Sequence, residues 1–145
     1  MRCSSRITID QRRICQLSRA AIISAEETAE ALHTDIVQAE VVPRRDGTLQ
    51  GESFFVDTSQ SGIGKVSLVH AEPYARRLYF HPEYKFHKEP WEETIEHSDG
   101  RVEHLTHDGN ANAKGKWLED WLPGGKKENF APDTFKRLYR RNSEL

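Results

Sequence analysis

The chain has 145 residues, of which 36% are hydrophobic and 30% charged, and its formal net charge is -2. This length fits one domain with a modest core, and the near-neutral charge argues against a general nucleic-acid binder held by phosphate neutralisation. No stretch approaches the roughly 20 apolar residues of a membrane span, and the N-terminus lacks the apolar run of a signal peptide, so the sequence predicts a soluble protein with no membrane partner.

Charge and cysteine are unevenly placed along the chain. The first nineteen residues hold five arginines against the single acid Asp10. The segment from Glu83 to Asp108 is rich in Glu and His, and the tail from Lys126 to Arg141 is basic again. The two cysteines, Cys3 and Cys15, match no zinc-site spacing and make a poor disulfide framework, which favours a reducing, cytosolic environment.

A long helix is predicted over about residues 10–40. Neither Gly nor Pro interrupts this stretch, and apolar residues recur every three or four positions to form one stripe. Asp10 suits the N-cap, and Pro43 prevents continuation. About thirty residues at 1.5 Å each span about 45 Å, whereas the radius of gyration of a compact domain of this size is about 15 Å. We therefore expect the helix to be kinked or to project toward another subunit.

Residues 52–82 are predicted to form a small antiparallel sheet with its connections. A turn at Asp46-Gly47 comes before it. Residues 52–58 are rich in β-branched and aromatic side chains, and residues 65–70 alternate apolar and polar side chains. The glycine-containing loop between these strands lacks the residues of a phosphate-binding loop, so we expect it to be a hairpin connection.

The stretch between Pro73 and Pro82 is the strongest candidate for a functional surface. It combines three aromatic residues with two adjacent arginines, and Tyr, Phe and Arg are enriched where proteins contact each other. Pro73 suits the first position of a short helix. Such a helix cannot bury all of these side chains, so we expect part of this surface to face a neighbour.

A β-hairpin around Asp99-Gly100 is predicted over residues 93–106, inside a polar insertion at about 88–108 that projects from the core. Pairing through a two-residue turn sets Glu96 opposite Glu103, which is unfavourable. The same pairing places one set of four side chains on a common face: Ile95, His97, Val102 and His104.

The same insertion holds the candidate metal ligands His97, His104, His107 and Asp108. None of them has the helical i, i+4 spacing, so solvated histidines are the expected interpretation. Adjacent acids elsewhere point in different directions and have no pocket signature around them. The sequence therefore predicts no catalytic residue, no cofactor and no bound metal.

Two C-terminal helices are predicted. The first covers about residues 113–122 and places Trp117 and Trp121, at helical spacing, in the core. The second covers about residues 131–141, with a buried side formed by Phe135, Leu138 and Tyr139.

Several blocks along the chain together resemble a known family. They are Ala39-Glu-Val-Val-Pro43, the segment Pro73–Tyr84, Asn110-Ala-Asn-Ala113 and Lys116-Trp-Leu-Glu-Asp-Trp-Leu122. Over nearly its whole length the chain resembles the minor capsid proteins of tailed phages that infect Gram-positive bacteria, and it is similar to the tail-completion, or head–tail joining, proteins of long-tailed siphophages. It departs from that pattern over residues 88–108, where such proteins usually have a shorter link.

This resemblance implies a single α+β domain over residues 1–145, with the long N-terminal helix packed on a small antiparallel β-sheet. The residue patterns add the short C-terminal helices and the inserted β-hairpin to this expected fold. It also implies a structural protein of the virion neck that is assembled in the host cytoplasm. Such a protein would form a homo-oligomeric ring, expected to be a hexamer, between the head-completion (stopper) protein and the tail-terminator or tail-tube protein. Viral DNA would pass through the lumen without sequence-specific binding.

The residues expected at the assembly interface are Asp46, Leu49, Tyr74, Arg76, Arg77, Tyr79 and Phe80. Two other classes of function stay open from the residues alone. One is a small metal- or nucleic-acid-dependent enzyme of a mobile element that uses the His-rich segment. The other is a DNA-binding module that uses the basic N-terminus and would bind bare DNA with a strong salt dependence.

Overall fold

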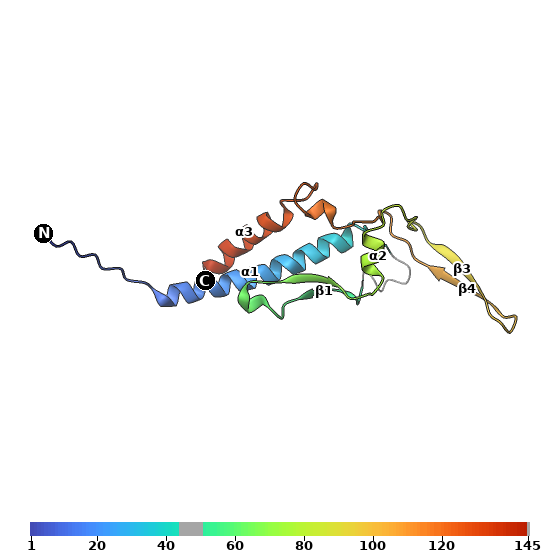
Figure 1. Ribbon diagram of the computed structural model, residues 1–145, viewed down its shortest axis with the longest axis horizontal. Helices are drawn as coiled ribbons and strands as arrows, with labels where there is room; N and C mark the ends of the chain where they lie inside the picture. Colours follow the sequence, from blue (N-terminus) through green and yellow to red (C-terminus); the bar gives the residue numbers. More distant parts are fainter. Residues whose placement is uncertain (44–50, 145) are drawn as a thin grey trace.

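The molecule is elongated, with an extended N-terminal arm at one end and a β-hairpin at the other (Figure 1). The computed structural model describes residues 1–43 and 51–144. Its elements are α1 (Gln11–Gln38), β1 (Phe54–Asp57), η1 (Ser61–Ile63), β2 (Ser67–His70), α2 (Ala75–Tyr79), β3 (Trp91–Glu96), β4 (Val102–His107), η2 (Glu119–Trp121) and α3 (Phe130–Ser143). The predicted α+β class is confirmed. Within the described ranges, no helix has the length and apolar character needed to cross a membrane.

The long N-terminal helix α1 forms as predicted. The Asp10 carboxylate accepts a hydrogen bond from the backbone N–H of Arg13 at 3.0 Å, which satisfies one of the N–H groups that a first helical turn leaves without a partner. The 28 residues of α1 span about 42 Å at 1.5 Å each. Figure 1 shows α1 lying along the long axis of the molecule, with its first turns beyond the end of α3. Of the two expected ways to fit so long a helix, the structure shows projection: the first turns of α1 extend beyond α3 (Figure 1).

Strands β1 and β2 form the predicted antiparallel hairpin on one side of α1. Their register pairs Phe54 with His70 and Asp57 with Ser67, and the short helix η1 lies in the loop that connects them. The sheet is fixed to α1 through His33, whose Nε2 lies 2.9 Å from the carbonyl oxygen of Phe54. The imidazole of His33 also packs against the Phe54 ring, with 4.4 Å between the ring centroids.

A chain of aromatic rings runs from this sheet into the core. The Phe54 and His70 rings stack at 4.1 Å, and Trp117 donates a hydrogen bond from its indole Nε1 to His70 Nε2 at 3.1 Å. The Tyr79 ring meets Trp117 edge-on at 4.9 Å. Both tryptophans predicted to be in the core are buried there, Trp117 at 1% exposure and Trp121 at 7%. The core thus joins α1, both strands, α2 and the segment before η2.

The prediction of a helix over residues 113–122 is wrong, since this stretch is helical over η2 alone. Its backbone instead bonds to distant parts of the chain. The N–H of Lys114 donates to the carbonyl of Val41 at 3.1 Å, and the N–H of Lys116 donates to the carbonyl of Tyr79 at 2.8 Å. Lys116 also has a φ of 47°, outside the helical region. These tertiary bonds outweigh the local helical pattern, which still places the tryptophans correctly.

Asn110 fixes the end of this connecting segment to the chain that follows α1. It is 3% exposed, and its Nδ2 donates to the carbonyl of Val42, a fully buried residue, at 2.7 Å. We predict that Asn110→Ala lowers the free energy of unfolding by about 2 kcal/mol, because a buried carbonyl loses its donor. Urea denaturation followed by circular dichroism measures this loss.

Asn112 offers the matched control for this prediction. Its Nδ2 makes the same kind of bond, to the carbonyl of Ala39 at 2.9 Å, but at an exposed site where water can take over. Asn112→Ala should therefore cost well under 1 kcal/mol. Equal losses for the two variants would contradict the role assigned to Asn110.

Strands β3 and β4 form the inserted hairpin, which extends away from the rest of the fold (Figure 1). The predicted register is wrong by one residue. Ile95 pairs with Glu103 and Glu96 pairs with Val102, so Ile95 and His104 lie on opposite faces. The observed pairing avoids the unfavourable opposition of Glu96 and Glu103.

The length of the loop explains the register. The backbone N–H of His97 donates to the carbonyl of Arg101 at 2.8 Å, which leaves residues 98–100 as a three-residue loop. Gly100 has a φ of 86°, the left-handed conformation that such loops require at their last position and that glycine adopts without strain. A two-residue turn had been expected from the Asp-Gly pair.

The C-terminal helix α3 extends the predicted range 131–141 by one residue at its start and two at its end. It lies alongside α1 (Figure 1). Leu138 is buried, and the Phe135 and Tyr139 rings are half-buried, as predicted. Near its end Arg141 binds both carboxylate oxygens of Glu27, at 2.8 and 2.7 Å. The two helices that carry the basic segments of the sequence are thereby held together.

Candidate assembly surface

One face of α2 is anchored in the core. Ala75 is 5% exposed, and the Leu78 and Tyr79 side chains are half-buried. Tyr79 packs against Trp117 as described above, and burial, together with the nearby Glu119 carboxylate, raises the pKa of Tyr79. Because α2 has only five residues, these contacts hold it in place, and intrinsic helix stability contributes little.

The rest of the segment carries the exposed side chains. Arg76 and Arg77 are exposed, and the aromatic residues on either side of the helix, Tyr74 and Phe80, are 42% and 58% exposed. Four of the seven residues predicted at the interface thus lie at the surface, and Tyr79 forms part of their base. Asp46 and Leu49 lie outside the described residues. The sequence prediction that this helix cannot bury all its large side chains is confirmed.

Arg77 is held in one orientation by the chain that follows α2. Its Nε donates a hydrogen bond to the Tyr84 hydroxyl at 3.1 Å, and its guanidinium lies 5.9 Å from the centre of the Tyr84 ring. The hydrogen bond to Tyr84 raises the pKa of Arg77, although a guanidinium is charged at neutral pH in any case. Such a fixed cation is better prepared for a contact than a freely rotating one.

His81 extends this arrangement. Its ring stacks on Tyr84 with 4.8 Å between centroids and 9° between planes. Its Nδ1 lies 2.6 Å from the Glu83 carboxylate, and this hydrogen bond lowers the pKa of Glu83. His81 lies within the predicted stretch but was not among the predicted interface residues, and Glu83 and Tyr84 lie just beyond that stretch. Their position directly after Phe80 could have indicated all three.

The candidate metal ligands are not brought together. His107 pairs with Glu93 at 2.7 Å, His97 with Glu103 at 3.1 Å, and His104 lies on the opposite face. Over residues 1–43 and 51–144, no group of three or more His, Cys, Asp or Glu side chains is placed to hold a metal ion. His104 and His107 are three residues apart on β4 and face opposite sides in any register, and the one-residue difference in hairpin register also separates His104 from His97.

The α2 surface therefore presents aromatic rings and guanidinium groups on a base fixed by the core. Comparison with models of known families, with curated proteins and with solved structures finds no match to this chain. Exposed Tyr, Phe and Arg on a rigid support are the side chains that dominate binding energy where proteins meet.

Proposed function

We propose that this chain is a structural protein of the neck of a tailed phage, which completes the tail and joins it to the filled head. In this proposal it forms a ring of six copies between the head-completion (stopper) protein and the tail-terminator or tail-tube protein, and viral DNA passes through the lumen. The observation that carries the proposal is the exposed set of Tyr74, Arg76, Arg77 and Phe80 on the core-anchored helix α2. The sequence resemblance to head–tail joining proteins supports it.

Ordering a flexible Arg or aromatic side chain in an interface costs free energy, which reduces affinity. Here α2 is held by Trp117 and by the Lys116 N–H, and Arg77 is already oriented by Tyr84. Much of that cost is met before binding. The elongated shape also separates different surfaces (Figure 1), as head-to-tail contacts within a ring require.

The double variant Arg76→Ala/Arg77→Ala tests this function. We expect its circular dichroism spectrum and unfolding midpoint to match the wild type, because both side chains are exposed. We expect the yield of joined particles, from filled heads and separate tails mixed with the purified protein, to fall about tenfold or more. Electron microscopy counts the joined particles, and native mass spectrometry reports the size of the ring.

A charge-matched control distinguishes the loss of a specific contact at α2 from the loss of net positive charge. Lys65 and Lys126 are exposed cations on other segments, so Lys65→Ala/Lys126→Ala removes the same charge and should leave joining intact. Wild-type joining by the arginine variant would overturn the role of α2. A wild-type protein that stays monomeric both alone and with tail components would overturn the ring itself.

A further inference from the structure

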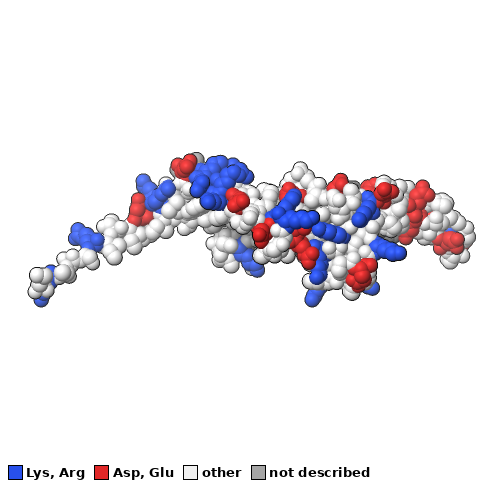
Figure 2. All heavy atoms as spheres, turned by 90° about the horizontal axis from the view of Figure 1, so that it is seen from above, with Lys and Arg blue, Asp and Glu red and all other residues white. Residues whose placement is uncertain are grey.

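The two ends of the molecule carry opposite charge. Figure 2 shows Lys and Arg gathered where the end of α3 lies over the first half of α1, and Asp and Glu prominent along the hairpin at the other end. The strands and loop of that hairpin hold five acids against the single cation Arg101; the acids are Glu92, Glu93, Glu96, Asp99 and Glu103. The two basic segments of the sequence thus meet at one end of the fold, and the acidic segment forms the other.

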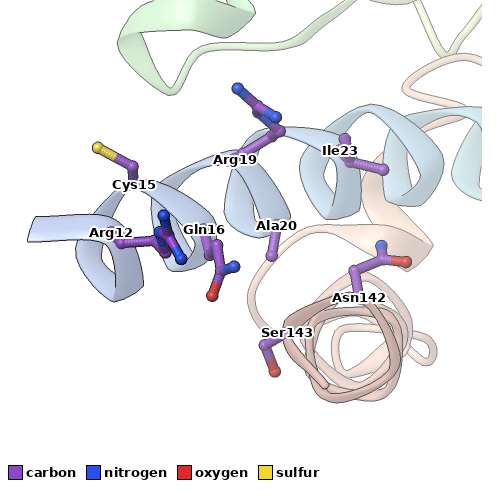
Figure 3. A pocket seen from close by; sticks show the side chains of 8 residues that line it. All are labelled: Arg12, Cys15, Gln16, Arg19, Ala20, Ile23, Asn142 and Ser143. Atoms are coloured by element: carbon purple, nitrogen blue, oxygen red, sulfur yellow. The ribbon is translucent and has the colours of Figure 1, made fainter. Parts of the chain in front are cut away.

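The basic end contains a groove of about 550 Å³ between α1 and α3. Its lining includes Arg12, Gln16, Arg19 and Ile23 from α1 and Asn142 and Ser143 from α3 (Figure 3). Arg12 and Arg19 are exposed, and neither forms an ion pair with any other described residue. The walls are joined by the bond from Arg13 Nη1 to the Ser143 carbonyl at 3.0 Å and by the bond from Asn142 Nδ2 to Ser24 at 3.0 Å. The groove is therefore a fixed, cationic surface with an apolar flank at Ile23.

The charge of the hairpin β3–β4 is opposite to that of the groove. Glu92 and Glu96 are exposed on one face, opposite Thr106 and Val102 of the partner strand, so no cation lies directly across from either. Val102, on the same face, is 54% exposed. An isolated two-stranded hairpin is marginally stable in water, and among the described residues β3 and β4 form a sheet of two strands alone. A partner that covers this face would stabilise the hairpin.

We propose that the acidic face of β3–β4 of one copy binds the basic groove between α1 and α3 of a second copy. This contact rests on the proposed ring and specifies how its subunits meet. The groove is lined by the first turns of α1 and the end of α3, which lie far from the hairpin along the long axis of the molecule (Figure 1). The contact is therefore head-to-tail, and repeated head-to-tail contacts form a ring when the rotation between neighbouring copies closes. Nucleic acid could also meet the arginines, but it would leave the acidic hairpin uncovered. A second copy covers both.

Charge exchange between the two surfaces tests the contact. The hairpin variant is Glu92→Lys/Glu96→Lys, and the groove variant is Arg12→Glu/Arg19→Glu. Each variant alone opposes like charges at every contact, and we expect its self-association constant to fall about tenfold or more. In an equimolar mixture every contact regains opposite charges, because each hairpin meets the groove of the other variant. We expect the mixture to recover the wild-type association, measured by sedimentation equilibrium and native mass spectrometry.

The mixture also constrains the number of subunits. An alternating ring closes only with an even number of copies, so a hexamer should contain three of each variant. Circular dichroism verifies that both variants are folded, and Lys65→Glu/Lys126→Glu serves as the control for charge reversal outside the two surfaces.

Four outcomes would overturn the contact. If the wild type forms rings and both variants associate as strongly as the wild type, the hairpin–groove contact is wrong and the proposed ring stands. If the mixture associates no better than the separate variants, the two surfaces do not meet. If the groove variant loses binding to a short DNA duplex, the hairpin variant keeps it, and neither changes self-association, the groove is a nucleic-acid site. If the wild-type chain remains monomeric in the presence of tail components, both the proposed ring and this contact are wrong.

Discussion

Trp117→Ala is expected to lower the free energy of unfolding by about 3–5 kcal/mol, enough to unfold a marginally stable domain. Trp117 is 1% exposed, and its ring contacts Tyr79 while its Nε1 bonds to His70. Its removal would leave a cavity where β2, α2 and the segment before η2 meet, and these elements cannot all close in around the space. Urea denaturation followed by far-ultraviolet circular dichroism measures the loss.

Two further variants serve for comparison: a control at an exposed side chain, and a substitution that removes the hydrogen bond of Trp117 but keeps much of its buried volume. Leu122→Ala removes a side chain that is 48% exposed and should change stability by less than about 0.5 kcal/mol. Trp117→Phe keeps much of the buried volume but removes the donor to His70 Nε2, and we expect an intermediate loss of about 2 kcal/mol. A Trp117→Ala protein as stable as Leu122→Ala would contradict the place of Trp117 at the centre of the core.

The parts of the fold that the sequence predicted well are those set by local interactions. Helix α1 has its N-cap at Asp10, an uninterrupted apolar stripe and a proline after its end, all of which can be read from neighbouring residues. The hairpin β1–β2 follows from a β-branched and aromatic stretch before a glycine-containing loop and from alternation after it. In both cases the residues that decide the structure lie within a few positions of the element that they form.

The incorrect predictions have non-local or fine geometric causes. The helical spacing of Trp117 and Trp121 correctly indicates burial, but the backbone around them bonds to Val41 and Tyr79, which no local pattern reveals. In β3–β4, a single extra loop residue moves every side chain of one strand to the other face. That shift separates His97 from His104, two of the histidines considered as metal ligands.

The two candidate surfaces likewise differ in how far the sequence alone reveals them. The exposure of Arg76 and Arg77 could be inferred from the composition of one short segment. The basic groove could not, because Arg12 and Arg19 are separated from Asn142 and Ser143 by more than a hundred positions in the sequence. The uneven charge of the chain is visible in the sequence, but the folded structure alone shows that both basic segments share one end and that the acidic hairpin lies at the other.

Gly115→Ala is expected to cost about 1–3 kcal/mol of stability, because the added methyl has no room. A Cβ at this position would lie 2.5 Å from Pro82 Cα and 2.8 Å from Pro82 N, both backbone atoms that cannot rotate away. Gly62→Ala is the matched control, since a Cβ there meets nothing within 4 Å. Thermal unfolding of both variants should show a lower midpoint for Gly115→Ala and an unchanged one for Gly62→Ala.

The same substitution also tests whether the proposed assembly surface depends on the packing beneath α2. Gly115 precedes Lys116, whose N–H holds the carbonyl of Tyr79 at the end of α2. Displacing Pro82 from Gly115 should loosen this anchor, so Gly115→Ala should also reduce head–tail joining at temperatures where the protein remains folded. Full joining by a destabilised Gly115→Ala protein would mean that assembly does not depend on the rigid placement of α2. Wild-type stability of Gly115→Ala would instead contradict the close packing of Pro82 on Gly115.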